Sequence, residues 1–130
     1  MNIIKIKETC LYVRDLDRTT AFYHGKLGFP VIGRVEGRHV FFRAGASVLL
    51  CFIAEATRAD TKLPPHFGQG QSHLAFEVHP GEYERWKAQI QLADIALIHE
   101  QAWQGGQQSF YFRDPDGHLL EILPEGALWA

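Results

Sequence analysis

The sequence has few cysteines and no long hydrophobic run. Only two of its 130 residues are cysteines, Cys10 and Cys51, and the start of the chain lacks the cationic end and apolar run of an export signal. A disulfide framework is therefore not expected. No apolar stretch approaches the roughly 20 residues that a membrane-spanning helix needs. We expect a cytoplasmic protein that makes no contact with a membrane.

The chain also lacks a basic surface. Its 13 Lys and Arg against 15 Asp and Glu give a formal net charge of −2, and the basic residues are scattered. A nucleic acid partner is therefore not expected. Hydrophobic residues make up 46% of the 130 residues, enough for an ordinary core in a single domain that spans residues 1–130.

One pattern occurs twice, over residues about 5–54 and about 71–123. The first copy opens with Glu8-Thr-Cys-Leu-Tyr-Val and the second with His73-Leu-Ala-Phe-Glu-Val. Each opening strand is followed by a helical pattern and then by three strand-like runs. The sequence therefore predicts an α+β fold made of two βαβββ repeats.

Alternation, capping residues and glycine turns place the individual elements. The first copy is expected to have a helix that starts at Asp15 and ends at Gly28, and strands over 5–13, 30–36, 38–44 and 47–54. The second is expected to have a helix over about 82–93, and strands over 71–78, 96–103, 108–113 and 118–123. Residues 55–70 show no periodicity and are expected to connect the copies.

Aligning the two copies brings metal-binding residue types into corresponding positions. The opening strands place Glu8 opposite His73, and an ungapped alignment on Phe42-Arg43 and Phe112-Arg113 places Cys51 opposite Glu121. If strands of the two copies face one another, these four side chains can converge. One imidazole and two carboxylates suit Mn²⁺, Fe²⁺, Ni²⁺, Zn²⁺ or Mg²⁺, whereas a Cys51 thiolate would favour Zn²⁺. We do not expect Cys51 to bind.

Each candidate also has an ordinary structural interpretation. Glu121 alternates with leucines, so if buried it should be neutral, paired or bound to a cation, but it could instead face solvent. His73 could be a hydrogen-bonded core histidine, and Glu8 could be solvated or paired with an arginine. The remaining candidate histidines form no ligand spacing: His24, His39, His66, His79 and His99.

Three segments resemble the vicinal oxygen chelate superfamily: Tyr12-Val-Arg-Asp-Leu-Asp-Arg-Thr-Thr-Ala-Phe-Tyr23, Leu27-Gly-Phe29 and Phe112-Arg-Asp-Pro-Asp-Gly-His-Leu-Leu-Glu-Ile122. That family includes glyoxalase I, fosfomycin resistance proteins, extradiol dioxygenases and bleomycin-binding proteins. The resemblance implies that the repeats form a cup-shaped, partly open mixed β-barrel with helices outside. It also implies a homodimer, although it does not say whether repeats pair within or between chains.

The resemblance further implies a set of site residues. His73 and Glu121 match the family's metal ligands, while Glu8 stands where many relatives have histidine and Cys51 where glyoxalase I has glutamate. The implied metal ligands are Glu8, His73 and Glu121, and either carboxylate could also move a proton in catalysis. The implied substrate pocket comprises Tyr12, Cys51, Tyr111 and Arg113.

Two functions are consistent with these residues. The first is a metal-dependent enzyme of the glyoxalase, fosfomycin-resistance or dioxygenase kind that acts on a small oxygenated molecule. The alternative is a metal-free protein that binds and sequesters an aromatic or cationic small molecule, as bleomycin-binding relatives do. The fold does not choose between them.

Overall fold

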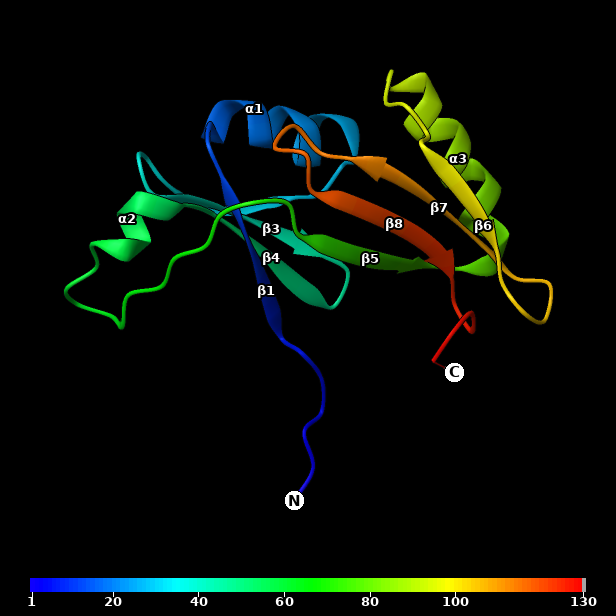
Figure 1. Ribbon diagram of the computed structural model, residues 1–130, viewed down its shortest axis with the longest axis horizontal. Helices are drawn as coiled ribbons and strands as arrows, with labels where there is room; N and C mark the ends of the chain where they lie inside the picture. The colour runs from blue at the N-terminus through cyan, green and yellow to red at the C-terminus, as the bar shows by residue number, and fades with distance from the viewer. Residues whose placement is uncertain (130) are drawn as a thin grey trace. The chain divides into compact units, whose positions relative to one another are not determined.

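The computed structural model describes residues 1–129, which form two compact units, one of residues 1–70 and one that begins at Gln71. Each unit contains one four-stranded mixed sheet that does not close on itself, together with its helices (Figure 1). The predicted α+β fold of two βαβββ repeats is confirmed. Within the described residues, no helix combines the length and apolar character that crossing a membrane requires.

The sheet of the first unit has the strand order β1-β4-β3-β2, with β1 parallel to β4 and the other neighbours antiparallel. Fully buried side chains of β3 and β4, such as Val40, Phe42 and Leu49, lie on the face that α1 covers. The elements are β1 (Glu8–Val13), α1 (Leu16–Thr20), the π-helical η1 (Ala21–Lys26), β2 (Val31–Val35), β3 (His39–Ala44), β4 (Ser47–Ile53) and α2 (Ala54–Arg58).

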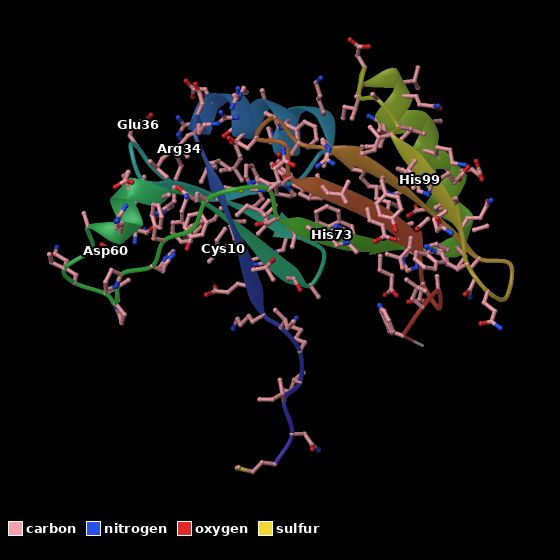
Figure 2. The ribbon with its side chains drawn as sticks, viewed as in Figure 1. Cys10, Arg34, Glu36, Asp60, His73 and His99 are labelled. Carbon is pink, nitrogen blue, oxygen red and sulfur yellow. The ribbon has the colours of Figure 1, made fainter. Side chains whose placement is uncertain are left out.

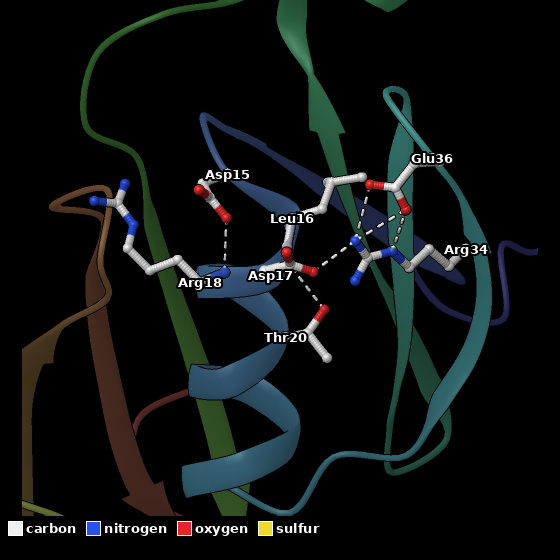
Figure 3. A network of polar contacts seen from close by, with 7 residues as sticks. All are labelled: Asp15, Leu16, Asp17, Arg18, Thr20, Arg34 and Glu36. Carbon is white, nitrogen blue, oxygen red and sulfur yellow. Dashed lines mark hydrogen bonds and ion pairs between the residues drawn. The ribbon is translucent and has the colours of Figure 1, made fainter.

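Local contacts fix the helix of the first unit. Asp15 Oδ1 accepts a hydrogen bond from the backbone N–H of Arg18 at 2.9 Å, which starts α1 as the sequence predicts. On β2, Arg34 reaches Asp17 of α1 at 2.8 Å and also pairs with Glu36 (Figure 3). This guanidinium joins the edge strand to the helix that covers its sheet.

The connector between the repeats is more regular than predicted. The short helix α2 begins at Ala54, the last residue of the predicted strand, and continues into the segment that was expected only to connect the copies. Ala, Glu and Arg are good helix formers, but five residues are too few for periodicity to be detectable. Beyond α2, the backbone N–H of His66 donates to Thr57 O at 3.3 Å.

The second unit repeats the arrangement with the strand order β5-β8-β7-β6. Phe110, Phe112 and Leu120 are fully buried on the face of the sheet that α3 covers. The opposite face carries the candidate site. The elements are β5 (His73–Val78), the 3-10 turn η2 (Pro80–Glu82), α3 (Tyr83–Leu92), β6 (His99–Ala102), β7 (Gln108–Arg113) and β8 (Leu119–Pro124).

A charge pair also joins the edge strand of this unit to its helix. Glu100 of β6 contacts the ammonium group of Lys87 and accepts a hydrogen bond from Tyr83 Oη at 2.9 Å. Burial, followed by Glu100, raises the pKa of Tyr83 well above its ordinary value, so the phenol keeps its proton. In the first unit the edge strand supplies the base and the helix supplies the acid. In the second unit the edge strand supplies the acid and the helix supplies the base.

Candidate functional site

Residues from all four strands of the second unit meet in one row across the open face of its sheet. Glu121 of β8 pairs with Ala75 of β5 on one side and with Tyr111 of β7 on the other, and Tyr111 pairs with His99 of β6. His73 lies two residues before Ala75 and therefore shares this face. This face of the sheet therefore carries an acid, a phenol and two imidazoles.

His73 and Glu121 face each other with their lone pairs. His73 Nδ1 is 2.9 Å from the carbonyl oxygen of Leu119, to which it donates, and His73 Nε2 is 3.3 Å from Glu121 Oε1. With the proton on Nδ1, Nε2 is an acceptor, as are both carboxylate oxygens. Two acceptors at this distance repel each other unless a proton or a cation lies between them.

The carboxylate of Glu121 is buried and incompletely paired. Its side chain is only 6% exposed, whereas that of His73 is 50% exposed. Among the residues described, Glu121 Oε2 has no hydrogen-bond partner. Leaving such a group unpaired costs about 1–3 kcal/mol, and more if it is charged. A carboxylate oxygen and the Nε2 atom of an Nδ1–H imidazole are both donor atoms for a divalent cation, and the Nδ1 contact to a backbone carbonyl is the usual support of a metal-binding histidine.

Tyr111 supplies a proton donor beside this pair. Burial raises the pKa of Tyr111, Glu121 raises it further, and a hydrogen bond with Ser109 opposes the rise. The phenol therefore stays protonated at neutral pH. Its ring lies 6.3 Å from that of His73 and 5.8 Å from that of His99, between centroids. Tyr111, predicted as a pocket residue, thus lies on the face that carries Glu121.

Cys51 does not correspond to Glu121, so the alignment that paired them is wrong. In the first unit Phe42 pairs with Leu49, and in the second Phe112 pairs with Leu120. The β7–β8 turn is therefore one residue longer, which makes Leu50 the counterpart of Glu121. A shift of one residue moves a strand side chain to the other face of the sheet.

The burial of Cys51 agrees with this register. The residue is completely buried and pairs with Leu11 and Val40, which are also buried on the helix-covered face. Tyr12, its predicted neighbour in the pocket, has the opposite strand parity and lies on the open face of the same sheet. Cys51 is therefore a core residue of the first unit.

The other alignment agrees with the strand pairing. Glu8 pairs with Val48 and His73 with Leu119, so Glu8 and His73 open their strands at corresponding places. Glu8 is exposed. No group of three acidic, histidine or cysteine side chains arranged to hold a metal occurs within residues 1–129.

Tyr12 is held by the connector of the first unit. Its hydroxyl forms a hydrogen bond with His66 Nδ1 at 2.6 Å. Burial, and then Cys10 on the same strand face, raises the pKa of Tyr12, so the phenol keeps its proton. A side chain at Gly68 would lie 2.6 Å from a ring carbon of Tyr12. Tyr12 thus lies against residues 66–68.

Arg113 supports a turn. Its Nη1 donates to the carbonyl oxygen of Gly117 at 2.8 Å and to Gln71 Oε1 at 3.5 Å. Gly117 has φ of +83°, which a residue with a side chain would adopt only with strain. Arg113 therefore spans the turn between β7 and β8, at the end of the strand that carries Tyr111.

His99, for which the sequence predicts no ligand spacing, lies on the site-bearing face of the sheet. His99 lies in the outer strand β6 and His73 in the outer strand β5 (Figure 2). The two residues are 26 positions apart in the chain, so no ligand spacing links them. The detectable signal was the pairing of β6 with β7, which puts His99 opposite Tyr111.

Similar proteins share the architecture. The structure superposes on the crystal structure of a lactoylglutathione lyase from Agrobacterium tumefaciens with a TM-score of 0.93 and 34% identity, covering 100% of this chain and 99% of that one. Glutathione transferase FosA of Serratia marcescens is 28% identical over 117 residues, which are 86% of this chain and 74% of the relative. Metallothiol transferase FosB of Shouchella clausii is 26% identical over 114 residues, 85% of this chain and 73% of the relative.

A family model covers nearly the whole chain as well. It is described as the Glyoxalase/Bleomycin resistance protein/Dioxygenase superfamily and matches residues 5–122. Both repeats, and both residues of the His73–Glu121 pair, lie inside the matched range. The resemblance expected from the sequence is therefore confirmed, and this chain belongs to the Glyoxalase/Bleomycin resistance protein/Dioxygenase superfamily.

Proposed function

We propose that the protein is a metal-dependent thiol transferase that joins a glutathione-like thiol to a small oxygenated electrophile. The observation that carries this proposal is the approach of His73 Nε2 to Glu121 Oε1 at 3.3 Å, beside a buried carboxylate oxygen with no partner among the described residues. Two relatives are named as transferases of glutathione or of a metallothiol. A thiol co-substrate follows from those names.

His73 and Glu121 would hold the divalent ion, and Glu8 is the third ligand that the family resemblance supplies. A bound ion would act as a Lewis acid toward a substrate oxygen. Tyr111 keeps its proton and would donate a hydrogen bond to an oxygen on the same sheet face. The limited exposure of Glu121 would exclude water from this end of the site.

The strand register of the first unit favours thiol transfer at a three-ligand metal site over a reaction that needs four metal ligands. Leu50 occupies the position that corresponds to Glu121, and leucine offers no donor atom. The corresponding positions therefore supply three donors, Glu8, His73 and Glu121, rather than four. A three-ligand site leaves more coordination positions for substrate oxygens.

A second candidate is isomerisation of a glutathione hemithioacetal, which the lactoylglutathione lyase neighbour favours. That neighbour is 34% identical and matches over the full length of this chain. Both candidates use a glutathione-type thiol. They differ in the electrophile, which is a strained cyclic ether in transfer and an α-oxoaldehyde in isomerisation.

The test measures metal content and both activities in the same preparations. Protein purified without added metal or chelator should contain near-stoichiometric divalent metal, which His73→Ala and Glu121→Gln should lose. The exposed residues His79 and Glu125 provide matched controls as His79→Ala and Glu125→Gln, which should retain the metal. Metal-dependent conjugation of glutathione to fosfomycin, an epoxide, supports transfer, whereas turnover of only the hemithioacetal supports isomerisation.

Two outcomes would contradict these predictions, one for the metal site and one for the homodimer. A parent protein that stays empty after incubation with Mn²⁺, Fe²⁺, Ni²⁺ and Zn²⁺ contradicts the metal site and leaves ligand sequestration as the better account. Sedimentation of the same samples tests the predicted homodimer. A monomer at assay concentrations that is fully active would contradict that prediction.

A further inference from the structure

We propose that His99 is the general base that removes the proton of the attacking thiol. This inference rests on the proposed thiol transfer. It assigns a role to an exposed histidine on β6, at the opposite edge of the sheet from His73 (Figure 2).

The tautomer of His99 is fixed by its neighbour on the same strand face. Gln101 Nε2 donates to the carbonyl oxygen of Ala102 at 3.0 Å, which turns Gln101 Oε1 toward His99. His99 Nε2 lies 2.9 Å from that oxygen and donates to it. The proton of the neutral imidazole is therefore on Nε2, and Nδ1 has a lone pair available. A base whose second nitrogen is held by a third group is the arrangement that acid–base catalysis requires.

The surroundings of His99 leave this nitrogen accessible. Tyr111 of β7, whose ring centroid is 5.8 Å away, is the titratable group that faces it, and its phenol keeps its proton. Glu100 of the same strand has the opposite parity and contacts Lys87 of α3 on the other side of the sheet. Those charges therefore do not share the face of His99.

The distance across the sheet suits a reaction with two substrates. His99 and Glu121 are separated by two strand spacings, about 10 Å at the backbone. A path from the metal ligands to His99 would contain a ligand bond of about 2 Å, a gap of about 3–3.5 Å between the reacting atoms and a hydrogen bond of about 3 Å. Placed end to end, these lengths are comparable to the separation of the two strands. The electrophile would lie by His73 and Glu121, and the thiol would lie over Tyr111 with its proton toward His99.

The proposed step balances. The S–H bond breaks and its proton moves to His99 Nδ1, while the sulfur electron pair forms the new S–C bond. The C–O bond of the cyclic ether breaks and leaves its electron pair on oxygen. That oxygen takes up one proton, from His99 or from solvent, and His99 returns to its neutral form. No oxidant or reductant is needed.

The closing experiment compares His99→Gln and Gln101→Leu with the exposed control His79→Gln. Nitrogen-15 NMR of the metal-free parent should show His99 as the Nε2–H tautomer, and Gln101→Leu should mix the tautomers. Glutathione added to the parent should give an ultraviolet thiolate band that His99→Gln loses, with S-methylglutathione as the blank. A parent with the Nδ1–H tautomer, or thiolate bands that are absent or equal in parent and variant, would overturn the proposal.

Kinetics supply a further signature. Transfer by His99→Gln should fall about 100-fold in kcat/KM at neutral pH, and the deficit should shrink as pH approaches the thiol's own pKa of about 8.5. A deficit that does not change with pH would contradict a base and indicate a structural role. If the parent neither binds metal nor transfers thiol, the proposed function fails. The tautomer and thiolate measurements require neither bound metal nor transfer activity, so they still decide the role of His99.

Discussion

Leu50 in β4 and Glu121 in β8 occupy corresponding positions in the two sheets. Each follows a buried leucine, Leu49 or Leu120, that pairs with the phenylalanine preceding an arginine. One repeat therefore presents a carboxylate on its open face where the other presents a hydrocarbon. The two repeats have equivalent strand pairing, but of these two positions only that in the second unit carries a polar side chain.

Replacing the incompletely paired carboxylate of Glu121 should stabilise the metal-free protein while it removes the metal site. We expect Glu121→Leu to raise the free energy of unfolding of the apoprotein by about 1 kcal/mol, because it removes a buried oxygen that has no partner among the described residues. The same variant should gain nothing from added Zn²⁺. Urea unfolding with and without Zn²⁺ measures both effects, with the exposed Glu125→Gln as control. Lower apoprotein stability would show that Glu121 is favourably paired.

The fold was predictable from the sequence because repetition and alternation are local. Both sheets, the Asp15 cap and the correspondence of Glu8 with His73 follow from such patterns. The place of Cys51 was not predictable by ungapped alignment, because the turn before β8 carries an extra residue and a one-residue shift changes the face. Burial shows on which face Cys51 lies, because the residue is completely buried on the helix-covered face of its sheet.

The candidate site was predictable only in part, for a different reason. His73 and Glu121 stand in recognisable motifs, so their residue types alone drew attention. His99 stands in a strand of four residues, and its role depends on the orientation of Gln101, which depends in turn on the carbonyl of Ala102. Sequence patterns do not encode a chain of contacts of that kind.

The close approach of Gly68 to Tyr12 should make this glycine difficult to replace. An added Cβ would lie 2.6 and 2.8 Å from two ring carbons, so the ring or the connector must move. We expect Gly68→Ala to lower the free energy of unfolding by about 1–3 kcal/mol. Gly81→Ala is the control, because its Cβ would meet nothing within 4 Å. If the clash is the cause, Tyr12→Leu should reduce the penalty of Gly68→Ala in the double variant.

The contact between Lys87 and Glu100 should make stability depend on pH in acid. The hydrogen bond from Lys87, and also that from Tyr83, lowers the pKa of Glu100, while burial opposes the shift. A carboxylate with a lowered folded pKa contributes stability that is fully present above its ordinary value of 4.5 and is lost as pH falls through the folded value. Glu100→Gln should therefore flatten the fall in stability below about pH 4.5. Thermal unfolding across pH 2–6 measures this, and the exposed Glu125→Gln should leave the profile unchanged.

Arg38 should contribute more to stability than Arg34, although both are arginines of the first unit that bind carboxylates. Arg38 pairs with Asp60 at 2.7 Å, where both side chains are at most 25% exposed, and its Nη1 lies 2.6 Å from His39 Nδ1. Arg34 pairs with Asp17, which is 88% exposed, and such surface pairs contribute about 0–1 kcal/mol. We therefore expect Arg38→Leu to destabilise the protein by more than Arg34→Leu does in urea unfolding.

Arg38→Leu and Arg34→Leu should also differ in their effect on the pKa of His39. Burial, followed by the positive charge of Arg38, lowers the pKa of His39, so removal of the guanidinium should raise that pKa without restoring its ordinary value. NMR titration of the His39 ring measures the change, and Arg34→Leu should leave it unaffected. Because a lowered histidine pKa favours the folded state above the ordinary value of 6.5, Arg38→Leu should also weaken the loss of stability below that pH. An unchanged His39 titration in Arg38→Leu would show that burial alone sets its protonation.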